Sequence, residues 1–306
     1  MSTSTSPPVQ SPETVTSRSP WHRRLSRAIQ PTILLLPSGV WLLLMLVFPT
    51  LLILELSLIP GMRPGQTVGD YGLGNYLEIF QPVYLRVIGR SVSFALGTTT
   101  ICLLLGFPVA YWIALMAPKR WQNLLLLGFV LPLWTSSLLR AYAWITILRR
   151  TGVLNTLLTT LGLPIQDWLN RSPAVFIGMS YSFLPYIVLI LYASLEKLDR
   201  RLLEAAADLG ATPWQTFWKV TVPQTLPGIA AGCLLVFITS LGDFVVPELL
   251  GGASSMTTAR LIYNQFLGAT RNWGLGSSLS MLLILAVSVS IALLIKYGDR
   301  NPEALS

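Results

Sequence analysis

Apolar residues in this chain are gathered into long runs that short polar segments separate. Six runs reach the roughly 20 residues that a helix needs to cross a bilayer. They predict transmembrane helices near residues 32–59, 91–116, 123–147, 174–195, 226–249 and 278–296. Prolines within several runs predict kinks, which bundles of membrane helices tolerate. The pattern therefore predicts an all-α, polytopic membrane protein.

A polar segment at residues 196–225 interrupts the second half of the chain and predicts two short helices joined by a turn. Asp199 is suited to cap the first helix, whose apolar stripe includes Leu202, Ala206 and Leu209. Gly210 suits the position just after that helix, where a left-handed backbone is needed. This first helix is therefore expected to lie between its cap Asp199 and Gly210.

The second predicted helix begins with Thr212-Pro213 and has Gln215 three residues after Thr212, the pattern of a capping box. Trp214, Phe217 and Trp218 then fall on one face of this helix. A helix pair with exposed apolar side chains between two membrane spans is expected to dock onto another protein.

The segment Glu204-Ala205-Ala206, Gly210 and Val220-Thr221-Val222-Pro223 resembles the cytoplasmic loop signature of ABC importer permeases. In that family the loop docks onto the partner ATPase. The resemblance implies a coupling role for Glu204, Ala205, Ala206, Gly210, Trp214, Phe217 and Pro223, and a type I ABC importer permease fold. The alternative is an amphipathic helix pair lying on lipid headgroups, but its polar face lacks the richness in Lys and Arg that such helices carry.

Composition supports membrane insertion: of 306 residues, 53% are hydrophobic and 11% are charged. The net charge of +8 is dispersed along the flanks of the spans, which favours anionic lipid headgroups over nucleic acid as the partner. Two cysteines in apolar runs and a single histidine provide no spacing for a metal site and predict no disulfide. No cofactor is expected.

Residues 1–30 are predicted to form a disordered cytoplasmic tail, and residues 31–306 the six-span domain. The run at 32–59 is too long for the apolar part of a signal peptide, so it is expected to be an anchor. More basic residues lie on the flanks that share a side with the N-terminus, including all the lysines: Lys119, Lys197, Lys219 and Lys296. The positive-inside rule then places both termini and the 196–225 loop in the cytoplasm.

The chain contains no Gly-Lys pair, so it has no P-loop for ATP, and no metalloprotease or nucleophile-elbow motif. It is therefore expected not to be an enzyme. Gly228 and Gly232 form a GxxxG pattern in the fifth run, which predicts close helix packing, either inside the subunit or between subunits.

Ionisable residues within the predicted spans are candidates for function because charges are costly there. They are Arg140, Asp243, Glu248 and Glu55. We expect aromatic residues at similar depth: Trp134, Tyr142, Tyr181, Phe183, Tyr186 and Phe244. Carboxylates beside aromatic faces suit an organic cation. The alternative is that Arg140 pairs with Asp243 to join two helices, while Glu55 and Glu248 lie among headgroups.

Two further segments, Leu131 to Trp144 and Gly242 to Gly252, look like permeases of spermidine/putrescine importers, and so does the segment from Ser194 to Asp199. The resemblance covers roughly residues 30 to 300. It implies a bacterial inner-membrane subunit working with ATPase subunits, a second similar permease and a periplasmic or tethered binding protein. It also implies a substrate path containing Asp243, Glu248, Trp134, Tyr181, Tyr186 and Phe244.

Three alternatives stay open at this point. A relative of the same family could carry another organic solute or an ion, and which polyamine is carried is undecided. A channel or secondary transporter could use the cytoplasmic helix pair for a different partner, although no internal repeat is visible. A membrane enzyme is disfavoured because no pair of nucleophile and base is visible.

Overall fold

The computed structural model describes residues 20–66 and 69–298. Within these residues the chain is helical and contains no strand. Five helices are long and apolar enough to cross a membrane, and a bent pair of helices provides a sixth span if it crosses as one. The chain divides into two compact units, Met1–Leu52 and Ile53–Ser306.

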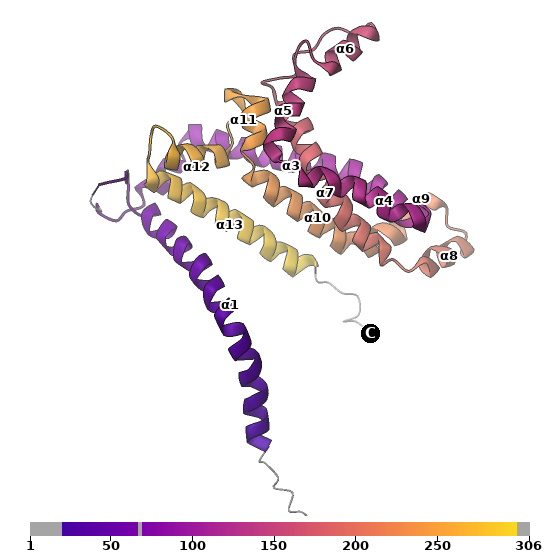
Figure 1. The fold of residues 1–306 in the computed structure, drawn as a ribbon, viewed down its shortest axis with the longest axis horizontal. Coiled ribbons are helices and arrows are strands. Elements are labelled where there is room, and N and C mark those ends of the chain that lie inside the picture. The colour runs from indigo at the N-terminus through magenta and orange to yellow at the C-terminus, as the bar shows by residue number, and fades with distance from the viewer. Residues whose placement is uncertain (1–19, 67–68, 299–306) are drawn as a thin grey trace, which may run out of the picture. The chain divides into compact units, whose positions relative to one another are not determined.

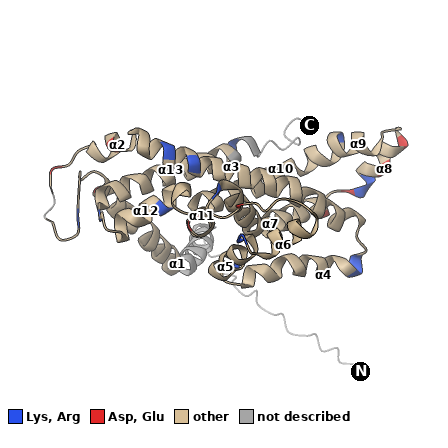
Figure 2. Ribbon diagram, turned by 90° about the horizontal axis from the view of Figure 1, so that it is seen from above, with Lys and Arg blue, Asp and Glu red and all other residues tan. Residues whose placement is uncertain are grey.

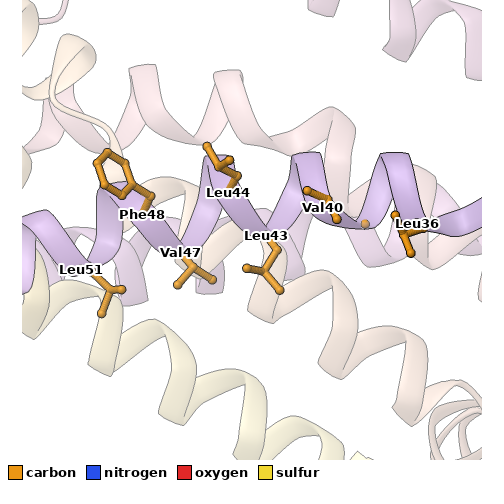
Figure 3. Close-up of a pocket in the computed structure, with 8 residues that line it drawn as sticks. Leu36, Val40, Leu43, Leu44, Val47, Phe48 and Leu51 are labelled. Atoms are coloured by element: carbon orange, nitrogen blue, oxygen red, sulfur yellow. The ribbon is translucent and has the colours of Figure 1, made fainter.

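The first unit contains most of α1 (Pro20–Ser57). Helix α1 begins within the predicted tail, while residues 1–19 of that tail lie outside the described residues. None of the most apolar 18-residue window within Leu36–Ser57 is buried. Figure 3 shows side chains from α1 alone, among them Leu43, Val47 and Phe48, lining a shallow apolar hollow. An apolar helix surface of this kind needs lipid or protein around it.

The core of the second unit is formed by three helices: α3 (Pro82–Tyr111), α7 (Ser172–Glu196) and α10 (Val222–Gly242). Helix α7 is central, since 56% of its span window is buried. Close packing depends on Gly228 and Gly232 of α10, where an added Cβ would meet Ser194 and Ile187 of α7. The GxxxG pattern therefore packs inside the subunit, which confirms one of the two predicted alternatives.

The predicted third span is not one straight helix. It consists of α4 (Lys119–Val130), a 3-10 turn (Leu131–Trp134) and α5 (Ser137–Leu148). The segments on either side of Thr135-Ser136 make an angle of 95°. Pro132 starts the 3-10 turn and Thr135 is extended, so the helical hydrogen bonds cannot continue through this point. Helix α6 (Val153–Thr160) follows α5.

The fifth span also ends earlier than the predicted residue 249. Helix α10 stops at Gly242, and α11 (Val245–Gly251) begins after the extended Asp243. A short 3-10 turn (Ala253–Ser255) and α12 (Thr258–Leu267) lead to the last span, α13 (Trp273–Gly298). Helix α2 (Gly74–Ile79) packs against α13.

The polar 196–225 segment forms α8 (Arg200–Asp208), α9 (Pro213–Thr216) and a π-helical turn (Phe217–Thr221) that runs into α10. Figure 1 shows α8 and α9 at one end of the α3–α7–α10 core and α11 and α12 towards the other. In Figure 2 charged residues colour the ribbon mostly at the ends of helices, including α8 and the start of α4. This distribution suits a membrane-spanning core with the helix pair at one surface.

Candidate functional site

The 196–225 segment is called the coupling loop after the signature that it resembles, and its first helix has both predicted caps. Oδ1 of Asp199 accepts a hydrogen bond from the backbone N–H of Arg201 at 3.0 Å. At the other end Gly210 has φ +79° and donates its N–H to the carbonyl of Ala207, while Ala211 donates to the carbonyl of Ala206. This pair of bonds is a Schellman motif, which ends a helix with a left-handed residue. The predicted boundaries of this helix are therefore confirmed.

The second helix begins with the predicted capping box. The hydroxyl of Thr212 accepts from the N–H of Gln215 at 3.3 Å, and Oε1 of Gln215 accepts from the N–H of Thr212 at 2.9 Å. Pro213 occupies its first turn, and Pro223 occupies the first turn of α10. These local bonds fix the geometry of the α8–α9 turn without help from the membrane domain.

Aromatic side chains join this helix pair to the core. The Phe217 ring stacks on Trp214 at 5.9 Å and also meets Phe107 and Tyr111 of α3 edge-on, at 5.6 and 5.8 Å. Trp214 stays 70% exposed, and Leu209 at the turn is 89% exposed. Large exposed apolar side chains of this kind are typical of a surface that contacts protein or membrane.

The carboxylate of Glu204 and most of α8 are also exposed. Among the described residues Glu204 makes no hydrogen bond or ion pair, and Ala205 leaves room beside it on the helix surface. The exposed groups of α8, α9 and the residues that follow each of them include one carboxylate and several apolar side chains. We call this set the coupling surface: Glu204, Ala205, Leu209, Trp214 and Trp218.

A second site lies where the broken spans meet. A pocket of about 280 Å³ is lined by the start of α5, the middle of α7 and the end of α10. Its polar and aromatic walls are Ser137, Arg140, Ser182, Phe183, Tyr186, Thr239 and Asp243. The pocket therefore brings two of the predicted path residues, Asp243 and Tyr186, together with Arg140 and Phe183.

The Asp243 carboxylate is held by the backbone of α11. Its Oδ1 accepts from the N–H of Val245 at 2.9 Å and from that of Val246 at 3.4 Å. No ion pair joins it to Arg140 in the part of the chain that the structure describes. Asp243 thus holds the start of α11 with one oxygen left for another partner, and the ion pair with Arg140 that was the alternative is not formed among the described residues.

The other predicted path residues lie outside this pocket. Glu248 forms an ion pair with Nη2 of Arg260 at 2.9 Å, and this guanidinium lies 5.0 Å from the ring centre of Tyr263. Phe244 stacks on the same Tyr263 ring at 5.3 Å. The Glu248 charge is therefore already paired with a cation.

Two aromatic path residues lie elsewhere. Tyr181 packs edge-on against Trp144 at 5.5 Å, and Trp134 at the helix break is 79% exposed. Glu55 accepts a hydrogen bond from the hydroxyl of Tyr71 at 3.2 Å at an exposed position. Of the predicted path residues, Asp243 and Tyr186 line the pocket, and the contacts of the others separate them from it.

Sequence reasoning missed the hydroxyl groups of Ser137, Ser182 and Thr239 in the pocket wall and the partners of Glu248, which are Arg260 and Tyr263. Ser137 follows directly on the helix break, which Pro132 and the polar pair Thr135-Ser136 could have indicated. Ser182 and Thr239 lie inside apolar runs, where no local pattern marks them. The Thr239 hydroxyl also donates to the carbonyl of Leu235 on its own helix at 2.8 Å, as hydroxyls in helices commonly do.

The architecture and the capped helix pair define a class of protein, the permease subunits of type I ABC importers. A solved bacterial ABC transporter involved in the import of the acidic polysaccharide alginate has a chain with the same fold. It matches with a TM-score of 0.72 and 20% identity, over 92% of this chain and 99% of that chain.

The family is identified by sequence. The family of the binding-protein-dependent transport system inner membrane component matches residues 106–300, and the chain belongs to this family. The spermidine/putrescine transport system permease PotB of Haemophilus influenzae is 42% identical over 87% of this chain and 92% of that protein. PotB of Escherichia coli K12 is 39% identical over 82% and 91%. The inner membrane ABC transporter permease YdcU of E. coli K12 is 33% identical over 74% and 76%.

Proposed function

We propose that this chain forms half of the membrane path of an importer for polyamines of the spermidine and putrescine type. The observation that carries the proposal is its 42% identity to a spermidine/putrescine permease across 92% of that protein. The pocket is consistent with this substrate class, because Asp243 offers an unoccupied carboxylate oxygen beside the rings of Phe183 and Tyr186. Carboxylate and aromatic faces together bind alkylammonium groups.

ATP hydrolysis belongs to partner ATPase subunits in this proposal, and the coupling surface is where one of them docks. Glu204 would meet a basic group of the ATPase, and Trp214 would enter an apolar pocket there. Phe217 would transmit the movement, since it connects the docking helix to Phe107 and Tyr111 of α3. A rigid helix pair with fixed caps is suited to this role because it moves as one body.

A second, similar permease would complete the path, and a periplasmic or tethered binding protein would deliver the polyamine at the end opposite the coupling surface. Both termini would then lie in the cytoplasm. Asp243 lies at the α11 end of α10, away from α8 and α9, and so would be an early station for the incoming substrate (Figure 1).

The test is reconstitution of the complete transporter in proteoliposomes. ATP-dependent uptake of labelled spermidine and putrescine is measured with the binding protein present, beside leucine and molybdate as solutes of different charge. We expect uptake of at least one polyamine, abolished when ATP is omitted. Uptake of leucine or molybdate without any polyamine uptake would replace the proposed substrate class by another member of the family.

A further inference from the structure

The Arg140 guanidinium is a charged group of the pocket whose buried N–H donors lack hydrogen-bond partners among the described residues. These donors are Nε and Nη1. Arginine stays charged in proteins and has five N–H donors to satisfy. It is fixed to the first turn of α5, where its backbone N–H bonds to the carbonyl of Ser136. A buried cation with open donors thus faces a pocket that also contains a carboxylate.

Asp243 cannot neutralise this cation by contact in the present arrangement. Its Oδ1 is committed to the N–H groups of Val245 and Val246, so turning toward Arg140 would uncap α11. Its Oδ2 accepts no hydrogen bond from the described part of the chain. Two opposite charges therefore share one pocket of about 280 Å³ while the anion keeps a free oxygen.

The contrast with Glu248 shows what a permanently paired carboxylate looks like in this chain. Glu248 and Arg260 are 2.9 Å apart, and Tyr263 covers the guanidinium. A carboxylate held in this way has no need of a second cation. Arg140 and Asp243 lack such a contact, which argues against a purely structural pair and leaves Asp243 able to accept an ammonium group.

We propose that Arg140 determines the affinity and turnover of the polyamine at Asp243 by acting as a fixed competing cation. An ammonium group that reaches Oδ2 enters the field of the guanidinium, and like charges in a partly buried pocket repel strongly. The repulsion weakens binding at this station and speeds departure toward the next one. A path must bind its cargo strongly enough to admit it and weakly enough to release it. This inference rests on the proposed polyamine substrate.

The central test is the kinetics of Arg140→Gln in the reconstituted transporter. We expect the apparent KM for spermidine to fall about tenfold and kcat to fall with it, because the substrate leaves more slowly. Arg140→Lys keeps the positive charge and should retain the wild-type KM. In the Asp243→Asn background, Arg140→Gln should leave the KM unchanged, because the carboxylate whose affinity for the ammonium group Arg140 weakens is no longer there.

Arg149→Gln is the matched control, because this arginine ends α5 in an exposed position and forms no ion pair among the described residues. A second variant, Thr239→Lys, adds a cation at an exposed position of the pocket wall, and its amount in the membrane is measured beside its KM. It should raise the KM about tenfold. An unchanged KM in Thr239→Lys, or a KM that is unchanged or raised in Arg140→Gln, would overturn the role of Arg140. Failure of the wild-type transporter to carry any polyamine would instead overturn the proposed function.

Discussion

The carboxylate of Asp243 has two tasks that substitution can separate. Asp243→Asn keeps an oxygen that can accept from Val245 and Val246, so the cap on α11 and the amount of folded protein should be retained. It removes the charge, and the KM for spermidine should rise about tenfold. Asp243→Ala removes the cap as well and should cost ~1 kcal/mol of stability.

Thermal unfolding of the purified subunit and uptake kinetics measure the two effects independently. Equal loss of stability in the Asn and Ala variants would mean that the charge, rather than the cap, holds the α10–α11 junction. Unchanged kinetics in Asp243→Asn at normal protein levels would remove this residue from the substrate path.

Position 210 requires glycine because of its backbone conformation and not because a side chain would clash there. Its φ is +79°, and a Cβ built there would meet no atom within 4 Å. Gly210→Val should therefore cost ~1 kcal/mol or more through the backbone alone and loosen the α8–α9 turn. We expect lower uptake per ATP hydrolysed at a normal level of membrane insertion. Gly210→Asn, which tolerates a left-handed backbone, should be close to wild type. Loss of coupling in both variants would contradict the conformational explanation.

Gly228 presents the opposite case, because here the limit is space. An added Cβ would clash with the side chain of Ser194 on α7. Gly228→Ala should lower the stability of the subunit by about 1–3 kcal/mol, the range for overpacked cores. The double variant with Ser194→Gly should recover most of the loss. Gly128→Ala is the control, as nothing lies within 4 Å of that position. Thermal unfolding in detergent provides the measurement, and additive losses in the double variant would refute the proposed contact.

At the scale of elements, the caps of the coupling loop could be predicted residue by residue because they depend on bonds within five positions of the sequence. Asp199, Gly210 and Thr212 each act through local backbone groups. Pro132 and the polar pair Thr135-Ser136 could have indicated a break in the third span, but its 95° angle could not be predicted, since it depends on packing against α7 and α11. The same limit applies to Asp243, whose run of apolar neighbours concealed the end of α10.

The capping box offers a test at this scale. Thr212→Ala removes the acceptor for the N–H of Gln215, a change worth ~1 kcal/mol. Hydrogen exchange of the amides in α9 should become about fivefold faster, while exchange in α7 stays unchanged. Thr212→Ser should restore protection. Thr216→Ala is the control, because the Thr216 hydroxyl makes no hydrogen bond among the described residues. Equal exchange in Thr212→Ala and Thr216→Ala would show that the box does not hold this helix.

At the scale of the whole molecule, the number of crossings depends on the bent pair α4–α5. Its start lies near α8, since the Ala114 carbonyl accepts hydrogen bonds from both Gln122 of α4 and Arg200 of α8. Its end lies near α11, since Leu148 packs in one cluster with Val246 and Leu250. The pair therefore runs from one end of the core to the other, which favours its crossing as one span.

The side of the membrane on which the coupling loop lies therefore shows whether α4–α5 crosses the membrane. If α4–α5 crosses, residues 117–122 and the 196–225 loop lie on one side of the membrane. If it re-enters on the side where it began, those two segments lie on opposite sides. Single cysteines at Arg120, Gln66 and Gln215 would report the two cases in a background where Cys102 and Cys233 are replaced by alanine. All three positions are exposed.

With an impermeant thiol reagent on intact cells, we expect labelling of Gln66→Cys alone. Arg120→Cys and Gln215→Cys should react only after the membrane is permeabilised, because both would face the cytoplasm, where ATP and the ATPase are. Labelling of Gln215→Cys from outside with Arg120→Cys protected would mean that the bent pair re-enters and that the helix pair cannot meet an ATPase. Labelling of both from outside, with Gln66→Cys protected, would invert the whole subunit in the membrane.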